Sequence, residues 1–99
     1  MNYSFHYEVE EEFNCAISYY EECQDGLGFD FASEVYSTIK RIVAYPNAWP
    51  VLIYDEVRRC QLNRFPYGVI YSKQNEHIYI LAVMHLHKKP EYWKYRISN

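Results

Sequence analysis

The sequence predicts an α+β domain of the order β-α-α-β-β-β, in which a helical hairpin packs on one face of a mostly antiparallel sheet and a short C-terminal tail follows. Three observations predict this fold: an alternating apolar segment at the N-terminus, two stretches with helical spacing, and short β runs gathered in the second half. The chain of 99 residues fits one domain, 1–99, because two independent cores would need roughly 100 residues each.

The N-terminal segment is predicted to be a strand followed by a helix. In residues 3–9, aromatic and branched side chains alternate with polar ones, and this period of two is typical of a strand with one apolar face. From about Glu10 the apolar residues recur at helical spacing instead, and acidic residues stand where they favour the positive end of the helix dipole. This helix is expected to end near Gln24.

A second helix is predicted after a short turn that contains glycine. Residues 25–28 supply the two glycines that a helix end and a tight turn need, and Asp30 can cap the helix that follows. Apolar residues then return at helical spacing as far as Tyr45, and Pro46 ends the helix. The two helices are therefore expected to form an antiparallel hairpin.

The second half of the chain is predicted to supply the rest of the sheet. Short β runs occur there at residues 51–54, 57–63, 67–72 and 77–87. Residues 73–76 have the composition of a hairpin turn, and residues 78–84 are apolar on both faces, which is typical of an interior strand. We expect the helices to cover one face of the sheet and to leave the other face open for a site. The charged tail at residues 90–96 is expected to pack as a helical turn or arm.

The sequence excludes several classes of protein. No stretch approaches the about 18 apolar residues of a membrane span, and the N-terminus lacks the basic start and apolar core of a signal peptide, so we expect a soluble, cytoplasmic protein. Cys15, Cys23 and Cys60 include no CxxC pair and are expected to be free thiols. No metal or cofactor is expected, because His85 and His87 lack a visible third ligand and no phosphate-binding glycine loop occurs.

Charge is distributed unequally along the chain. Residues 1–49 contain two basic and nine acidic residues, a net charge of −7, whereas residues 50–99 contain eight basic and four acidic residues, a net charge of +4. One interpretation is that the basic half forms a face for an acidic partner. The other interpretation is that the two halves attract each other within the domain.

A basic cluster that contains histidine is the candidate site. His85 and His87 lie two residues apart at the end of the last predicted strand, so both side chains are expected on one face of the sheet. The basic residues nearby are Arg58, Arg59, Arg64, Lys88, Lys89 and Arg96. Phosphodiester cleavage without a metal needs a base, an acid and a cation, which such a cluster can supply, and the same cluster can equally form a docking surface. Tyr92 and Trp93 can stack on bases or cover the open end of the core.

Three segments carry a family resemblance: AISYYEECQDGLGFDFASEV at residues 16–35, WPVLIYDEVRRCQLNRFPYGVIY at residues 49–71 and ILAVMHLHKKPEYWKYR at residues 80–96. They contain an arginine pair, an FPY hairpin and an AV-x-H-x-x-K-x-P-x-Y-W ending in this order. With this combination the chain resembles the RelE/ParE superfamily of bacterial type II toxins. The resemblance implies a growth-inhibiting toxin, of the kind linked to plasmid stabilisation, that a cognate antitoxin wraps around and keeps inactive.

The resemblance leaves two mechanisms open. Ribosome-dependent, metal-independent mRNA endoribonucleases of the superfamily place an arginine just before the strand that here begins at Val69, and this sequence has Gly68 there. The candidate catalytic residues for this mechanism are Arg64, His85, His87 and Tyr92. The ParE branch, which is thought to poison DNA gyrase without cutting RNA, suits a chain without that arginine. A net charge of −3 is also unfavourable for a protein that enters the ribosome.

We therefore favour a toxin that acts by binding its target over an enzyme. The residues predicted to bind the target are Arg58, Arg59, Lys88, Lys89, Trp93 and Arg96. A third alternative is a protein of the toxin fold that has lost toxicity and survives as a binding partner of its antitoxin.

The predicted partners are a cognate antitoxin and a target, either DNA gyrase or the ribosome with its mRNA. The antitoxin is expected to supply an acidic or amphipathic segment that folds on docking and neutralises residues 50–99. A homodimer and a toxin–antitoxin hetero-oligomer both remain open.

Overall fold

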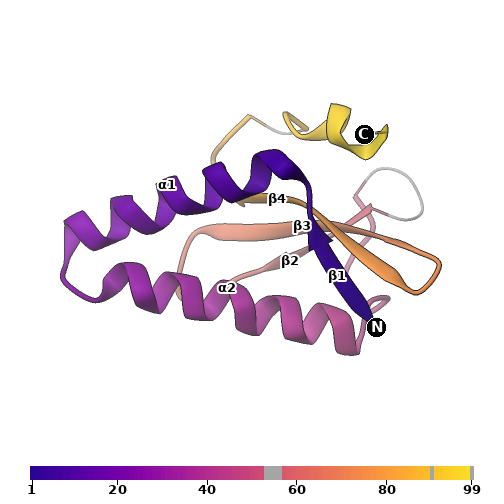
Figure 1. The fold of residues 1–99 in the computed structure, drawn as a ribbon, viewed down its shortest axis with the longest axis horizontal. Helices are drawn as coiled ribbons and strands as arrows, with labels where there is room; N and C mark the ends of the chain where they lie inside the picture. The colour runs from indigo at the N-terminus through magenta and orange to yellow at the C-terminus, as the bar shows by residue number, and fades with distance from the viewer. Residues whose placement is uncertain (53–56, 90, 99) are drawn as a thin grey trace.

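A four-stranded sheet carries a pair of helices on one of its faces (Figure 1). The computed structural model describes residues 1–52, 57–89 and 91–98. The elements in chain order are β1 (Asn2–Phe5), α1 (Tyr7–Cys23), α2 (Leu27–Ala44), β2 (Val57–Gln61), β3 (Tyr67–Gln74), β4 (His77–His85) and a 3-10 helix, η1 (Lys94–Ser98). The predicted α+β class and the order β-α-α-β-β-β are therefore confirmed.

The strand order in the sheet is β1-β4-β3-β2. β2, β3 and β4 pair antiparallel, whereas β1 pairs parallel with β4, from Asn2 opposite His77 to Phe5 opposite Ile80. A parallel pair needs a long crossover connection, and the path through α1, α2, β2 and β3 supplies it. The interior position that the apolar run 78–84 predicts is confirmed, because β4 lies between β1 and β3.

The predicted first strand is too long. Residues 3–9 were expected to be extended, but β1 ends at Phe5 and α1 begins at Tyr7. The physical reason is a cap, because Nδ1 of His6 accepts a hydrogen bond of 3.2 Å from the backbone N–H of Glu8. Tyr7 and Val9 continue the alternation of the strand although they lie in the first turn of α1. The sequence pattern alone therefore places the end of the strand too late.

The predicted cap of the second helix is also wrong. Asp30 lies within the first turn of α2, and the N-cap residue is Gly26, whose φ of 86° is readily adopted only by glycine. The carboxylate of Glu21, near the end of α1, accepts the N–H groups of Gly26 and Gly28 at 3.0 Å each. One acid of the first helix therefore caps the second, and this bond closes the hairpin.

Apolar side chains pack on both faces of the sheet. The larger core lies between the helices and the sheet, and the smaller one lies on the other face. The members of the smaller core are Val57, Ile70, Leu81, Ala82, Met84 and Trp93. The expectation of an open face is therefore wrong, because the tail carries Trp93, which is 2% exposed, onto that face. Figure 1 shows η1 beside the start of α1, away from α2.

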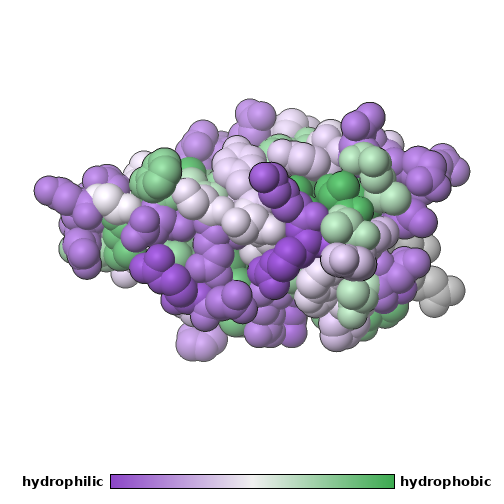
Figure 2. Space-filling model, turned by 90° about the horizontal axis from the view of Figure 1, so that it is seen from below, coloured by the Kyte–Doolittle hydropathy of each residue, from purple (hydrophilic) through white to green (hydrophobic). Residues whose placement is uncertain are grey.

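The helical side of the molecule has a largely polar exterior. Seen from the α2 side, hydrophilic residues cover most of the surface, and apolar residues form separate patches (Figure 2). In the described part of the chain, no helix has both the length and the apolar character that crossing a membrane requires.

The predicted run 51–54 can be compared with the structure only in part. Val51 forms an isolated antiparallel bridge with Arg58, and residues 53–54 lie outside the described residues.

Tyr71 gives a test of the packing behind β3. Its buried hydroxyl donates a 2.6 Å hydrogen bond to the carbonyl of Pro46, and burial raises the pKa of Tyr71 from 10.0 to about 12. We expect Tyr71→Phe to lower the free energy of unfolding by about 1 kcal/mol at neutral pH, because Pro46 loses its donor. Because the unfolded tyrosine ionises first, wild-type stability should also fall between pH 10 and 12 more steeply than that of the variant. Urea unfolding at pH 7, 10 and 11.5 measures both effects, and identical pH slopes would contradict this account.

Candidate functional site

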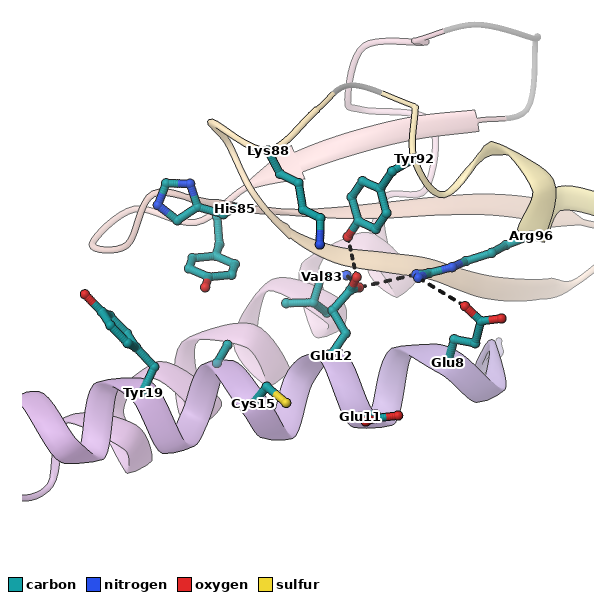
Figure 3. A pocket seen from close by; sticks show the side chains of 12 residues that line it. Glu8, Glu11, Glu12, Cys15, Tyr19, Val83, His85, Lys88, Tyr92 and Arg96 are labelled. Carbon is teal, nitrogen blue, oxygen red and sulfur yellow. Dashed lines mark hydrogen bonds and ion pairs between the residues drawn. The ribbon is translucent and has the colours of Figure 1, made fainter.

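A groove of about 570 Å³ lies between α1, the end of β4 and the C-terminal tail (Figure 3). Four residues predicted from the sequence line it: His85, Lys88, Tyr92 and Arg96. Three acidic residues of α1, Glu8, Glu11 and Glu12, line it from the opposite side. In Figure 3 Lys88 and Tyr92 reach from the turn and the tail toward Glu12, which projects from the helix. The site therefore combines residues from both ends of the sequence.

Glu12 joins the three elements that form the groove. Its Oε1 accepts a 2.9 Å hydrogen bond from the backbone N–H of Val83 and lies 3.4 Å from Nη1 of Arg96. Its Oε2 accepts the hydroxyl proton of Tyr92. Nη1 of Arg96 also donates to the carbonyl of Leu81 at 2.9 Å. One carboxylate thus ties α1, β4 and the tail together.

The sheet topology explains why side chains bind the backbone of β4 here. β1 pairs with β4 only as far as Ile80, so among the described residues the edge of β4 beyond Ile80 has no neighbouring strand on that side. The ladder with β3 also shifts register there, and Leu81 is the extra residue on β4. Glu12 and Arg96 therefore satisfy peptide groups that a neighbouring strand would otherwise bind.

Arg96 is a buried cation held by two carboxylates. Its side chain is 6% exposed and its Nη2 lies 3.5 Å from Glu8, which also accepts a hydrogen bond from Tyr95. Burial opposes the charge of Arg96, but hydrogen bonds to Tyr95 and Glu12 outweigh it and raise the pKa of Arg96. The bond to Tyr95 in turn lowers the pKa of Glu8. Arg96 therefore stays charged, with both terminal nitrogens engaged by acceptors, whereas its buried Nε has no hydrogen-bond partner among the described residues.

Tyr92 is a hydrogen-bond donor in this site. Burial, and then the hydrogen bond to Glu12, raise the pKa of Tyr92 far above its usual value. The phenol therefore stays protonated at neutral pH and donates to Glu12. The ammonium of Lys88 lies 4.4 Å from the centre of its ring, and the guanidinium of Arg96 lies 5.2 Å from it. These cation–π contacts hold the ring between two cations.

His85 lies at the other end of the groove, half-buried beside Tyr67. The two ring centres are 5.2 Å apart in an edge contact. Nδ1 of His85 accepts a 3.0 Å hydrogen bond from the backbone N–H of His87, so the neutral ring carries its proton on Nε2. The expectation that His85 and His87 share one strand face is wrong, because β4 ends at His85 and His87 lies in the following turn. The turn nevertheless brings the two imidazole rings together, with their centres 5.2 Å apart.

Arg64 lies in the loop between β2 and β3 and does not line the groove. Its guanidinium pairs with Asp30 at 3.7 Å and stacks on Phe65 at 5.2 Å. The loop itself is held to α2, because the carboxylate of Glu34 accepts the backbone N–H groups of Asn63 and Arg64.

The remaining predicted residues lie apart from the groove. Arg58 donates to the carbonyl of Trp49 at 2.6 Å and therefore anchors the loop before β2. Arg59 lies across Gly68, where an added Cβ would approach its Cγ and Cδ to 3.1 Å. Lys89 is exposed outside the groove. Trp93 was predicted to bind the target. Instead, it lies in the smaller core, where its ring covers apolar side chains on the second face of the sheet.

The sequence analysis missed Glu8 and Glu12 as site residues. Glu8 was interpreted as a polar residue of the first strand and Glu12 as a partner of the helix dipole, although their spacing of four residues places them on one face of α1. Among the described residues, no group of three or more histidine, cysteine or acidic side chains is placed to hold a metal ion. All three cysteines are free thiols.

The fold is similar to that of one chain in a solved structure described as the chromosomal ParDE TA system from P. aeruginosa. The TM-score is 0.71, the sequence identity is 17%, and the match covers 86% of this chain and 95% of that chain. No protein-family model matches the sequence, and no curated protein matches it. At this identity the similarity concerns the fold. The fold that the sequence resemblance implies is therefore confirmed.

The neighbouring acids Glu11 and Glu12 provide a matched test of the network. We expect Glu12→Gln to lower the free energy of unfolding by about 2 kcal/mol, because the buried Arg96 then keeps only Glu8 as a counter-charge. Glu11→Gln removes the same charge from an exposed position and should change stability by less than about 0.5 kcal/mol. Urea unfolding followed by tryptophan fluorescence measures both. Equal effects of the two changes would mean that Glu12 does not hold the tail.

Proposed function

We propose that the chain is the toxin of a type II toxin–antitoxin system, that it arrests growth by binding DNA gyrase, and that a cognate antitoxin neutralises it. The observation that carries this proposal is the similarity to a chain of the ParDE toxin–antitoxin structure, which extends over 86% of this chain. A shared fold does not by itself define a function, so the site must supply the rest of the argument.

The geometry of the groove supports binding rather than RNA cleavage. A nuclease without a metal needs a free cation for the charged transition state and side chains that exchange protons near neutral pH. Arg96 is occupied by two carboxylates, and Tyr92 has a raised pKa and donates to Glu12. The acids of α1 also repel phosphate. With a net charge of −3, the chain has little general attraction for RNA.

A ribosome-dependent mRNA endoribonuclease is the second candidate. It is favoured by one observation, which is that His85, Lys88 and Tyr92 line the same groove. For this reaction His85 would exchange protons and Lys88 would face the phosphate, whereas Arg64 and His87 would have to reach the groove from outside it. A protein of this fold without toxicity is the third candidate.

Expression of the chain alone in a bacterial host tests these candidates. Primer extension on abundant messages and plasmid topology are measured in the same culture. We expect growth arrest with intact messages and gyrase trapped on DNA. Cleaved messages with normal topology would replace the proposal with the nuclease, and continued growth with soluble protein would favour the protein without toxicity.

Alanine variants test which surface carries toxicity. We expect Arg64→Ala or His85→Ala to abolish growth arrest and to leave the thermal melt nearly unchanged, because neither side chain is buried in the core. Lys73→Ala is the matched control, since it removes a charge at the distant β3–β4 hairpin. Toxicity that survives both test substitutions would show that this end of the sheet does not contact the target.

A further inference from the structure

The two edges of the sheet differ in how well they are protected against pairing with another strand. β2 forms one edge and carries Arg58 and Arg59. The carbonyl of Val57 accepts a 2.9 Å hydrogen bond from the backbone N–H of Leu52, so the loop before β2 covers part of this edge. β1 forms the other edge, and residues 1–5 contain no charged side chain and no proline. Charged side chains and prolines are what usually prevents pairing at a sheet edge, so β1 lacks this protection.

The backbone of β1 presents hydrogen-bonding groups on its outer side. The N–H of His6 donates to the carbonyl of Ile80 in β4 at 2.9 Å. Peptide groups alternate in direction along a strand, so those of Ser4 also face β4, whereas those of Tyr3 and Phe5 face outward. Within residues 1–52, 57–89 and 91–98, no hydrogen bond reaches the outward groups of Tyr3 and Phe5. A further strand can therefore pair with β1.

An apolar surface accompanies this edge on the helical side of the sheet. Tyr3 is 40% exposed, and its ring lies edge-on to that of Phe5, which packs against the larger core. Ring contacts continue from Phe5 to Phe13 and from Phe13 to Tyr36, which is 45% exposed. A cavity of about 260 Å³ lies among these rings, and its lining residues are Phe5, Glu10, Phe13, Asn14, Ile17 and Tyr36. Apolar surface thus extends from the strand edge onto the helices.

The sequence of β1 is complementary to itself in one antiparallel register. In this register Tyr3 lies opposite Tyr3 of a second copy, and Asn2 lies opposite Ser4. Opposed residues point to the same face of a sheet, so tyrosine meets tyrosine on the helical side and two polar side chains meet on the other side. Phe5 lies opposite Met1, which is another apolar pair. A shift by one residue would instead set apolar side chains against polar ones.

We propose that the chain forms a homodimer in which β1 pairs antiparallel with β1 of a second copy about a two-fold axis at Tyr3. The two four-stranded sheets then join into one continuous sheet. Met1 of the partner subunit lies beside Phe5, next to the cavity of about 260 Å³, where a flexible thioether side chain can fill apolar space. No residue of β1 lines the groove, so the dimer goes beyond the proposed function and does not depend on it.

A second copy suits this edge better than a charged partner does. Each chain has a net charge of −3, but like charges do not face each other across the pair because residues 1–5 carry no charged side chain. The contact is small, since β1 has only four residues and a stable interface buries roughly 1,200 Å² or more. We therefore expect a dimer that dissociates on dilution.

Sedimentation of the full chain tests for the dimer. We expect the weight-average mass to rise toward that of a dimer between about 10 µM and about 1 mM protein. Tyr3→Lys places two like charges on the two-fold axis and should weaken dimerisation about tenfold, the equivalent of about 1.4 kcal/mol. Phe29→Lys is the matched control, because it also replaces an exposed aromatic ring with lysine, at the end of α2 far from β1 (Figure 1). The control should dimerise like the wild type.

Cysteine cross-linking tests the register. All variants carry Cys15→Ser and Cys23→Ser, because these two natural thiols are exposed. Opposed residues that exchange both backbone hydrogen bonds have Cα atoms about 5.5 Å apart, a separation that a disulfide spans. We expect Tyr3→Cys to form a disulfide-linked dimer under mild oxidation. Ser4→Cys alone should form none, because its two copies lie beyond the about 7 Å limit of a disulfide, but it should cross-link when mixed with Asn2→Cys.

Three outcomes overturn the inference. The first is a monomer at every concentration, and the second is a Tyr3→Lys variant that dimerises as strongly as the wild type. The third is equal cross-linking of Tyr3→Cys and of Ser4→Cys alone. If thermal melting shows that Tyr3→Lys does not fold, the concentration series of the wild type and the cross-linking still decide. Neither measurement involves growth arrest, so dimerisation and toxicity are decided independently.

Discussion

The contact between Arg96 and Glu12 is the interaction on which the rest of the site depends. The tail has too few apolar residues to dock by burial alone, and among its described residues the large apolar side chain that is buried is Trp93. Arg96 adds a buried charge that two carboxylates balance, and its Nη1 also donates to the carbonyl of Leu81. A buried cation without these partners would cost several kcal/mol, so the tail and the first turns of α1 must keep their relative positions. The groove lies between these elements, so its shape depends on the contact between Arg96 and Glu12.

Opposite charges of the two halves of the sequence meet at particular contacts inside the domain. Acids of the helices neutralise Arg64 and Arg96, and Glu34 holds the loop that carries Arg64. The interpretation that the halves attract each other is therefore confirmed for these residues. Other basic residues of the second half, such as Lys88 and Lys89, lie outside these ion pairs.

The sequence by itself determined the elements and their order, because apolar periodicity and turn residues act over a few neighbouring residues. The hairpin at residues 73–76 and the interior strand at residues 78–84 follow from such local patterns. Only the tertiary structure decided the composition of the site. Glu12 and Arg96 are 84 residues apart, and their contact depends on where β1 ends and on the register shift at Leu81. Trp93 likewise became a core residue because the second face of the sheet must be covered, a requirement that no local pattern contains.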